Sequence, residues 1–216
     1  MGNLDLITII VIAANAIISF KGFKDVSFFE RYKFNVGAIK RGEKIRMFSA
    51  GFLHVDTMHL FFNMFTLYFF APVVIYFLGT VHFLIIYVIS LILGNLLSLY
   101  FHKDQPYYTA VGASGAVTGV LYAAILLQPD MQLGLMFIPL PIPAYVFGIL
   151  YLLYSIYGMK KQLGNIGHDA HFGGAIGGYV TTLILMPSLF QTDLKMVILL
   201  ALPILLLFVL HRTGRL

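Results

Sequence analysis

The 216-residue sequence contains no cysteine, which excludes a disulfide framework, a thiolate nucleophile and a cysteine-ligated metal site. Charge is also scarce, since Asp, Glu, Lys and Arg make up 11% of the residues while hydrophobic residues make up 60%. The apolar runs are far longer than the short strands or amphipathic stripes of a soluble core. The formal net charge of +5 gathers near the ends of these runs. Lipid headgroups attract Lys and Arg there, so no nucleic-acid partner is needed to explain the charge.

Seven apolar runs organise the chain. In lipid every backbone polar group must be satisfied, and unbroken runs without period-two alternation achieve this as α-helices. The sequence therefore predicts an all-α, polytopic membrane helix bundle with six core helices, at residues 6–20, 57–78, 81–101, 114–128, 142–158 and 170–188. The run Met196–Leu210 predicts a seventh, C-terminal helix. We expect one membrane domain over residues 1–190, followed by the extra helix and a basic tail over 191–216.

The connections between the runs carry topological information. The first run lacks a basic segment before it and an A-x-A site after it, so we expect a retained membrane segment and no signal peptide. Basic and aromatic residues over 21–53 suit an element lying in the membrane interface. Three prolines in "MFIPLPIPAY" exclude regular helix there. Every Lys and Arg except Lys195 lies in the first, third or fifth connection or at the C-terminus, which the positive-inside rule assigns to the cytoplasm.

Ser114 is the first candidate for chemistry, because polar residues within membrane spans are costly and tend to be functional. The segment "YYTAVGASGAVTG" places it in the first turn of the helix predicted at 114–128. Free backbone N–H groups in such a turn can stabilise a developing oxyanion, which is what acyl transfer needs. Taken alone, such a serine is more often a packing residue or a helix cap.

Glycine spacing predicts how this serine acquires a base. Two predicted helices carry small-residue faces, made by Gly115 with Gly119 and by Gly174 with Gly178. Such faces let membrane helices approach closely. His171 precedes Gly174 by three residues and shares its face, so packing of the two faces brings His171 within hydrogen-bond reach of Ser114. A base beside a serine hydroxyl is the minimal activated nucleophile.

The neighbouring polar residues of "GNIGHDAHFGG" receive other roles. His168 lies one turn nearer the aqueous end than His171 and about 60° away around the helix, which favours a structural role. Asp169 lies on roughly the opposite side of the helix from His171 and cannot readily orient its imidazole. We therefore expect a Ser-His dyad, with His168 and Asp169 marking only the point where the helix meets water.

The segment "HVDTMHLFFN" supplies a third cluster at the same end of the bundle. His59 and Asn63 are four residues apart and share a helix face, while His54 falls elsewhere around the axis. An imidazole N–H and an amide N–H on one face can both donate to an oxyanion. The alternative for Asn63 is an interhelical hydrogen bond without a role in chemistry.

Three motifs, "HVDTMHLFFNM", "GASG" and "AHFGGAIGG", follow one another in an order that resembles the rhomboid intramembrane serine proteases, over roughly residues 1–190. The resemblance implies that Ser114 is the nucleophile and His171 the general base. It implies an oxyanion hole formed by His59, Asn63 and the Ser114 backbone. It requires no metal or organic cofactor, and it implies transmembrane proteins in the lipid bilayer as substrates.

The resemblance also implies a set of supporting residues around the dyad, namely His54, Gly112, Gly115, Gly119, Gly174, Gly178 and Arg46. Two positions depart from the family pattern. Ile45 stands before Arg46 where a Trp is usual, which weakens the expected anchoring of the first connection. Thr118 stands four residues after Ser114, where many members carry an aromatic ring against the catalytic histidine. We therefore expect His171 to be held less tightly than in those members.

The predicted function is an intramembrane serine endopeptidase that cleaves transmembrane segments of other membrane proteins. One alternative is a rhomboid-like non-catalytic protein that binds or escorts client helices, although such relatives typically lack the Ser or the His. A transporter or channel would be expected to show spans broken in two halves, which are not evident. A metalloprotease lacks H-E-x-x-H and would have to use His54, His59, His168 and Asp169. We expect a multi-pass protein of a bacterial inner membrane whose active site opens to the extracytoplasmic side, as in the family and against the distribution of basic residues.

Overall fold

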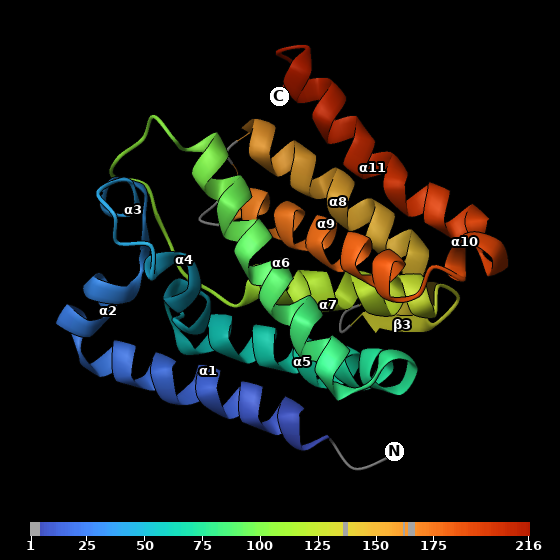
Figure 1. The fold of residues 1–216 in the computed structure, drawn as a ribbon, viewed down its shortest axis with the longest axis horizontal. Coiled ribbons are helices and arrows are strands. Elements are labelled where there is room, and N and C mark those ends of the chain that lie inside the picture. Colours follow the sequence, from blue (N-terminus) through green and yellow to red (C-terminus); the bar gives the residue numbers. More distant parts are fainter. Residues whose placement is uncertain (1–4, 136–137, 162, 164–166) are drawn as a thin grey trace.

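The computed structural model describes residues 5–135, 138–161, 163 and 167–216 (Figure 1). Its helices are α1 (Leu6–Lys24), α2 (Val26–Tyr32), α3 (Val36–Lys40), α4 (Arg46–Ser49), α5 (Thr57–Leu78), α6 (Thr80–Phe101), α7 (Ser114–Leu127), α8 (Ala144–Lys161), α9 (His168–Leu185), α10 (Leu189–Thr192) and α11 (Leu194–Arg212). A 3-10 turn, η1 (Ala50–Phe52), follows α4. Four short strands, β1 (Phe34–Asn35), β2 (Thr109–Ala110), β3 (Gln132–Leu135) and β4 (Ile138–Pro143), form two antiparallel pairs.

All seven predicted membrane helices are present, as α1, α5, α6, α7, α8, α9 and α11. Four of them, α1, α5, α6 and α11, are long and apolar enough to cross a membrane. The sixth predicted helix ends three residues early, at Leu185, because the residue before Pro187 is disfavoured in a helix. The prediction of an all-α polytopic bundle is confirmed, and the chain is an integral membrane protein.

Helix α7 forms the centre of the bundle and begins at Ser114. Every residue from Gly115 to Leu127 is buried, and α5, α6 and α9 all pack against it. Figure 1 shows α7 passing behind α6, with α5 on one side of it and α8 and α9 on the other. A helix that is apolar on all faces is stable where neighbours cover it all round, which explains why short, uncharged α7 lies inside.

Local sequence signals set the helix starts. The carboxylates of Asp5, Asp25 and Asp56 cap α1, α2 and α5, and each accepts a hydrogen bond from a first-turn N–H. Such a cap stabilises a helix by about 1 kcal/mol. The Asp56 carboxylate accepts from the His59 N–H at 2.7 Å, which fixes His59 in the first turn of α5.

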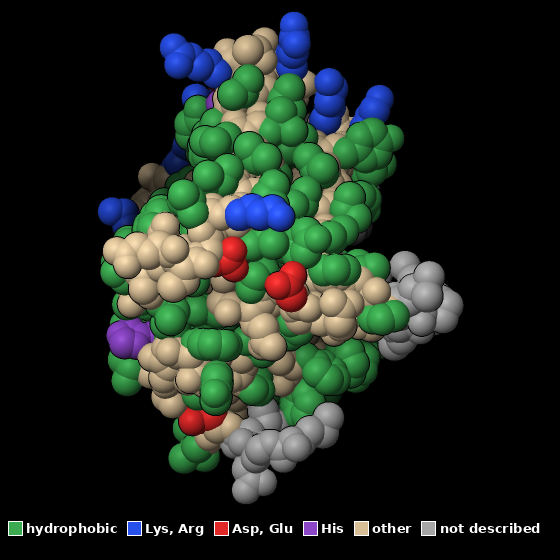
Figure 2. Space-filling view, turned by 90° about the vertical axis from the view of Figure 1, so that its right-hand side faces the viewer, with side chains coloured by type: hydrophobic (Ala, Val, Ile, Leu, Met, Phe, Trp, Pro, Cys, Tyr) green, Lys and Arg blue, Asp and Glu red, His purple; other side chains and the backbone are tan. Residues whose placement is uncertain are grey.

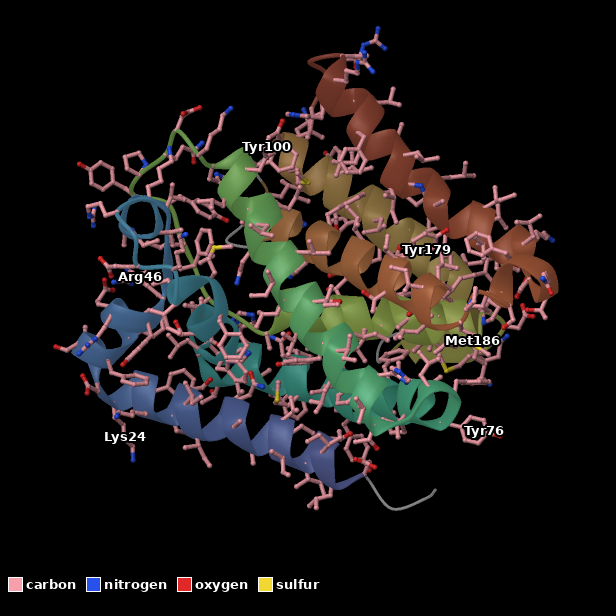
Figure 3. All side chains as sticks on the ribbon, viewed as in Figure 1. Lys24, Arg46, Tyr76, Tyr100, Tyr179 and Met186 are labelled. Carbon is pink, nitrogen blue, oxygen red and sulfur yellow. The ribbon has the colours of Figure 1, made fainter. Side chains whose placement is uncertain are left out.

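The connection between α1 and α5 is folded around a buried arginine. Arg46 is 9% exposed and donates to the carbonyls of Glu30 at 2.8 Å and Lys33 at 2.9 Å. Its Nε also donates to the Glu43 carboxylate at 2.8 Å. Figure 3 shows Arg46 among α2, α3 and α4. Ile45 is 60% exposed, and the weaker anchoring expected from the missing Trp stays a prediction.

A strand pair ties this connection to the segment before Ser114. Phe34 pairs with Ala110, and Asn35 pairs with Thr109. Beside this pair the Gly37 N–H donates to the carbonyl of Pro106 at 3.0 Å. The loop that leads into α7 is therefore held by backbone hydrogen bonds to a distant part of the sequence.

The three prolines before α8 lie in β4, which pairs with β3, and this agrees with the predicted absence of helix there; residues 136–137 of the stretch lie outside the described residues. After α9, the short helix α10 leads into α11, which packs on α8. The Tyr179 hydroxyl of α9 donates to the Val197 carbonyl of α11 at 2.7 Å, and Figure 3 shows Tyr179 between these helices. The domain boundary at residue 190 stays a prediction.

The surface is apolar over long stretches of the helices. Figure 2 shows the side of the molecule at which α10 lies, where hydrophobic side chains cover much of the face and Lys and Arg gather towards the upper edge. Large exposed hydrophobic residues on α1, α5 and α11 include Leu6, Ile17, Phe65, Leu205 and Phe208. A surface of this kind matches the apolar interior of a bilayer.

Candidate active site

The loop before α7 leads to Ser114 through Gly112, whose backbone conformation favours glycine. Gly112 has a φ of +136°, and a Cβ on it would lie 2.7 Å from Cε1 of His59 and 3.5 Å from Oγ of Ser114. The Gly112 N–H donates to the Ala50 carbonyl at 3.0 Å. In the part of the chain that the structure describes, no side chain caps α7. The N–H groups of its first turn are therefore open to an anionic group.

A cavity of about 610 Å³ lies between α5, α7, α8 and β3 and reaches Ser114. His59 and Asn63 also line it. The Asn63 amide donates to the His59 carbonyl at 3.0 Å, and Nδ1 of His59 is buried without a partner among the described residues. The rest of the wall is mainly apolar and includes five phenylalanines, Phe62, Phe65, Phe69, Phe70 and Phe147. The two predicted oxyanion donors of α5 thus share one cavity with the serine.

Helices α7 and α9 meet through their glycines, as the spacing predicts. A Cβ on Gly174 would collide with the carbonyl of Gly115, and a Cβ on Gly178 would collide with the carbonyl of Gly119. The position of a Cβ on Gly115 lies 3.2 Å from the carbonyl oxygen of Ala170. The first turns of the two helices, which carry Ser114 and His171, are therefore neighbours.

Among the described residues, His171 makes a polar contact with a tyrosine of α8. Its Nδ1 lies 2.9 Å from Oη of Tyr151, and the two rings stack with 22° between their planes and 6.0 Å between centroids. Tyr151 also lines the cavity, and its Oη lies 3.4 Å from Oγ1 of Thr118. The expectation of a loosely held His171 is wrong, because α8 supplies the ring that position 118 lacks. Sequence reasoning missed Tyr151, and the small residue at 118 is the one signal that could have prompted a search for it.

His168 and Asp169 do not mark a contact with water, so that prediction is wrong. Each is only 4% exposed. His168 packs against Gly158, and its ring meets Tyr154 edge to face at 5.4 Å. The Asp169 carboxylate lies 3.4 Å from Nε2 of His102. The end of α8 and the start of the α6–α7 loop cover this turn of α9, which a helix considered alone does not reveal.

His54 contacts α1, α5 and the loop before α7. It is fully buried, and its Nδ1 lies 2.8 Å from Oγ of Ser19 on α1. Its Nε2 accepts the N–H of Ala113 at 3.4 Å, and its ring meets that of His59 edge to face at 4.9 Å. The pKa of His54 is lowered to about 3, mainly by burial and to a smaller extent by the nearby His59. The imidazole is therefore neutral and positions the loop residue directly before Ser114.

The candidate metal ligands do not assemble. Within the described ranges, no group of three His, Asp or Glu side chains could hold a metal ion. His168 and Asp169, in the first turn of α9, pack against the end of α8 and the α6–α7 loop. His54 and His59 lie against each other, the first before α5 and the second within it. The donor set of a zinc protease is therefore missing from this part of the chain.

The fold is that of a polytopic helical membrane protein in which longer helices enclose a short central helix, with Ser114 and several histidines at one end. Comparison with protein families identifies which family of membrane proteins this is. Residues 41–188 match the family model described as the Rhomboid domain, and the chain belongs to the rhomboid family.

Several curated proteins share this similarity. The chain is 26% identical over 191 residues to "RHOMBOID-like protein 12, mitochondrial" of Arabidopsis thaliana, covering 81% of the chain and 56% of that protein. It is 31% identical over 138 residues to "Rhomboid protein 1, mitochondrial" of Saccharomyces cerevisiae, covering 62% and 40%. It is 33% identical over 141 residues to "Rhomboid protease GluP" of Bacillus subtilis, covering 65% and 26%. The chain spans about half the length, or less, of these relatives.

Proposed function

We propose that the chain is an intramembrane serine endopeptidase in which Ser114 is the nucleophile and His171 the general base. The observation that carries the proposal is the glycine contact between α7 and α9, which makes neighbours of the turns bearing these two residues. A serine that begins a buried helix beside an open cavity, with a histidine on the adjacent helix, has the components of acyl transfer.

In the proposed reaction, Oγ of Ser114 attacks the substrate carbonyl carbon while His171 takes the hydroxyl proton. The carbonyl oxygen becomes an oxyanion, which receives hydrogen bonds from the Ser114 N–H and the side chains of His59 and Asn63. Collapse of this intermediate breaks the peptide C–N bond, and His171 returns the proton to the leaving amine. Water then attacks the carbonyl carbon of the acyl-enzyme while His171 takes a proton from it. The ester bond to Ser114 breaks, and His171 returns the proton to Oγ of Ser114.

The proposed substrate is a transmembrane segment of another protein that enters sideways from lipid. The cavity supports this choice, because its wall is mainly apolar and α5 and α8 border it. An α-helix hides its carbonyls in backbone hydrogen bonds, so the segment must unwind before attack. Substrates with Gly, Pro or polar residues near the cut would unwind most readily.

We also propose that the end of the bundle that carries Ser114 and His171 opens away from the cytoplasm. The basic residues of that end favour the opposite orientation, but Lys and Arg of a compact interfacial segment can bind lipid phosphates instead. Two of the relatives named above are mitochondrial by name and one belongs to a bacterium, so a bacterial inner membrane stays a prediction. Labelling of single cysteines introduced at exposed Lys103 and at Lys195, on intact cells and on permeabilised cells, tests the orientation.

The test of the activity is cleavage of a single-span substrate in proteoliposomes. Ser114→Ala and His171→Ala should each lower the rate about a thousandfold or more. Ser188→Ala and His211→Ala change exposed residues of the same types and should leave the rate unchanged. Cleavage that survives Ser114→Ala would refute the proposal. Binding of the substrate without cleavage or fluorophosphonate labelling by the wild type would instead favour the non-catalytic escort.

A further inference from the structure

A chain of three polar side chains crosses from α7 through α8 to α9 beside the candidate dyad. Oγ1 of Thr118 lies 3.4 Å from Oη of Tyr151, which in turn lies 2.9 Å from Nδ1 of His171. The Tyr151 ring also lies nearly parallel to the imidazole, with 22° between the planes. One residue of α8 thus hydrogen-bonds to a nitrogen of His171 and holds its own ring nearly parallel to the imidazole.

The proposed role of His171 fixes the direction of these hydrogen bonds. A general base needs one unprotonated ring nitrogen towards the serine, and a neutral imidazole then carries its proton on the other nitrogen. With the proton on Nδ1, the imidazole donates to Oη of Tyr151, and the tyrosine hydroxyl donates onward to Oγ1 of Thr118. Nε2 is left free to accept the proton of Ser114. A hydroxyl can accept and donate at the same time, whereas a phenylalanine ring offers neither.

The other polar groups near His171 do not take this role. The Asp169 carboxylate is directed to His102. The His168 ring stands edge to face with His171 at 6.3 Å between centroids, and both of its nitrogens are without hydrogen-bond partners among the described residues. In the same part of the chain, the Tyr151 hydroxyl is the partner recorded for the His171 ring.

We propose that Tyr151 is a positioning residue of this enzyme, which holds His171 in the tautomer with a proton on Nδ1 and fixes the plane of its ring. This inference rests on the proposed protease function. It assigns to α8 the task that a ring four residues after the nucleophile could otherwise perform from α7, where Thr118 is too small. Because Tyr151 lines the cavity, the contact sits where a bound substrate would shield it from water.

The decisive variant is Tyr151→Phe, which keeps the ring and removes the hydroxyl. We expect kcat to fall about tenfold to a hundredfold with little change in KM, because substrate binding does not use the hydroxyl. Tyr151→Leu also removes the stacked ring and should lower kcat further. Tyr157→Phe is the matched control, since Tyr157 lies on the same helix and is 53% exposed. Its kcat should equal that of the wild type.

A spectroscopic readout separates positioning from general damage. Nitrogen-15 NMR of protein labelled at histidine, with His171→Gln identifying the signal, should show a protonated Nδ1 in the wild type and a mixture of tautomers in Tyr151→Phe. An unchanged tautomer together with an unchanged kcat in Tyr151→Phe would overturn the inference. This result is distinct from failure of the protease proposal, in which Ser114→Ala retains activity. The NMR measurement tests the contact in that case too.

Discussion

Nε2 of His102 lies 3.4 Å from the carboxylate of Asp169, which joins the end of α6 to the first turn of α9. The imidazole also stacks on the Tyr108 ring, with 3.5 Å between centroids and 7° between planes, and its Nδ1 is 2.9 Å from Oε1 of Gln105. Burial opposes protonation of His102, but the nearby Asp169 carboxylate and the hydrogen bond to Gln105 outweigh it and raise the pKa. The protonated form of His102 is therefore favoured, and it clasps the loop before Ser114 to the helix that carries His171.

This clasp predicts a stability that declines with rising pH. Folding raises the pKa of His102 above its ordinary value of 6.5, so the clasp contributes fully below that value and is lost as the pH rises through the folded pKa. Asp169→Asn removes the carboxylate and should lower the free energy of unfolding by about 1–3 kcal/mol near pH 6.5. The variant should lose less stability than the wild type as the pH rises above 6.5. Thermal unfolding in detergent measures both, and parallel pH profiles would contradict the clasp.

His54 predicts the opposite response at acidic pH. Its pKa falls to about 3 on folding, so below about pH 6.5 the unfolded chain takes up a proton that the folded chain refuses. At about pH 4.5 this should cost about 2–3 kcal/mol of stability. His54→Gln removes the titrating ring and should reduce the acid sensitivity by that amount. His211→Gln alters an exposed histidine and serves as the control; an equal reduction there would count against the assignment.

The glycine contact between α7 and α9 predicts a strong effect of single methyl groups. Gly178→Ala places a Cβ against the carbonyl of Gly119 and forces the helices apart. Overpacking of this kind costs about 1–3 kcal/mol. A displacement of about 1 Å between the proposed dyad residues should lower the cleavage rate about a hundredfold. Gly167→Ala is the control, because among the described residues, its chain neighbours aside, the nearest atom to its Cβ is 3.6 Å away. Equal losses in both variants would contradict this explanation.

The buried guanidinium of Arg46 predicts a fourth stability effect. Arg46→Ala leaves the carbonyls of Glu30 and Lys33 without their donor and should cost about 2–4 kcal/mol. Arg31→Ala on exposed α2 should cost less than about 0.5 kcal/mol. Thermal unfolding compares the two, and limited proteolysis should cut Arg46→Ala faster within residues 25–45. Equal cleavage of both variants would show that Arg46 does not hold this segment.

The helices could be predicted from the sequence because long uninterrupted apolar runs determine membrane spans. The seven apolar runs needed no knowledge of their neighbours, and the glycines of α7 and α9 predicted which faces meet because a small residue is useful only where another backbone approaches. The same spacing led to Ser114 and His171.

Side-chain contacts across sequence distance lay beyond that reasoning. Tyr151 carries no local signal, since a tyrosine on an apolar helix reads the same whether it faces lipid or a histidine. Asp169 was interpreted as exposed because its own helix begins there, whereas a loop from elsewhere in the chain covers it. Arg46 was expected only as a supporting residue, and its burial against the carbonyls of Glu30 and Lys33 follows from the folding of a connection that no local pattern describes.

The pairing of β1 with β2 sets an order on biogenesis. Residues 34–35 leave the ribosome well before their partners at 109–110, so the segment after α1 completes its hydrogen bonds only when α6 has been made. His171 follows later still. During synthesis the serine therefore emerges without its neighbouring histidine, and a half-made chain in the membrane cannot digest the proteins around it if the proposed dyad does the cutting.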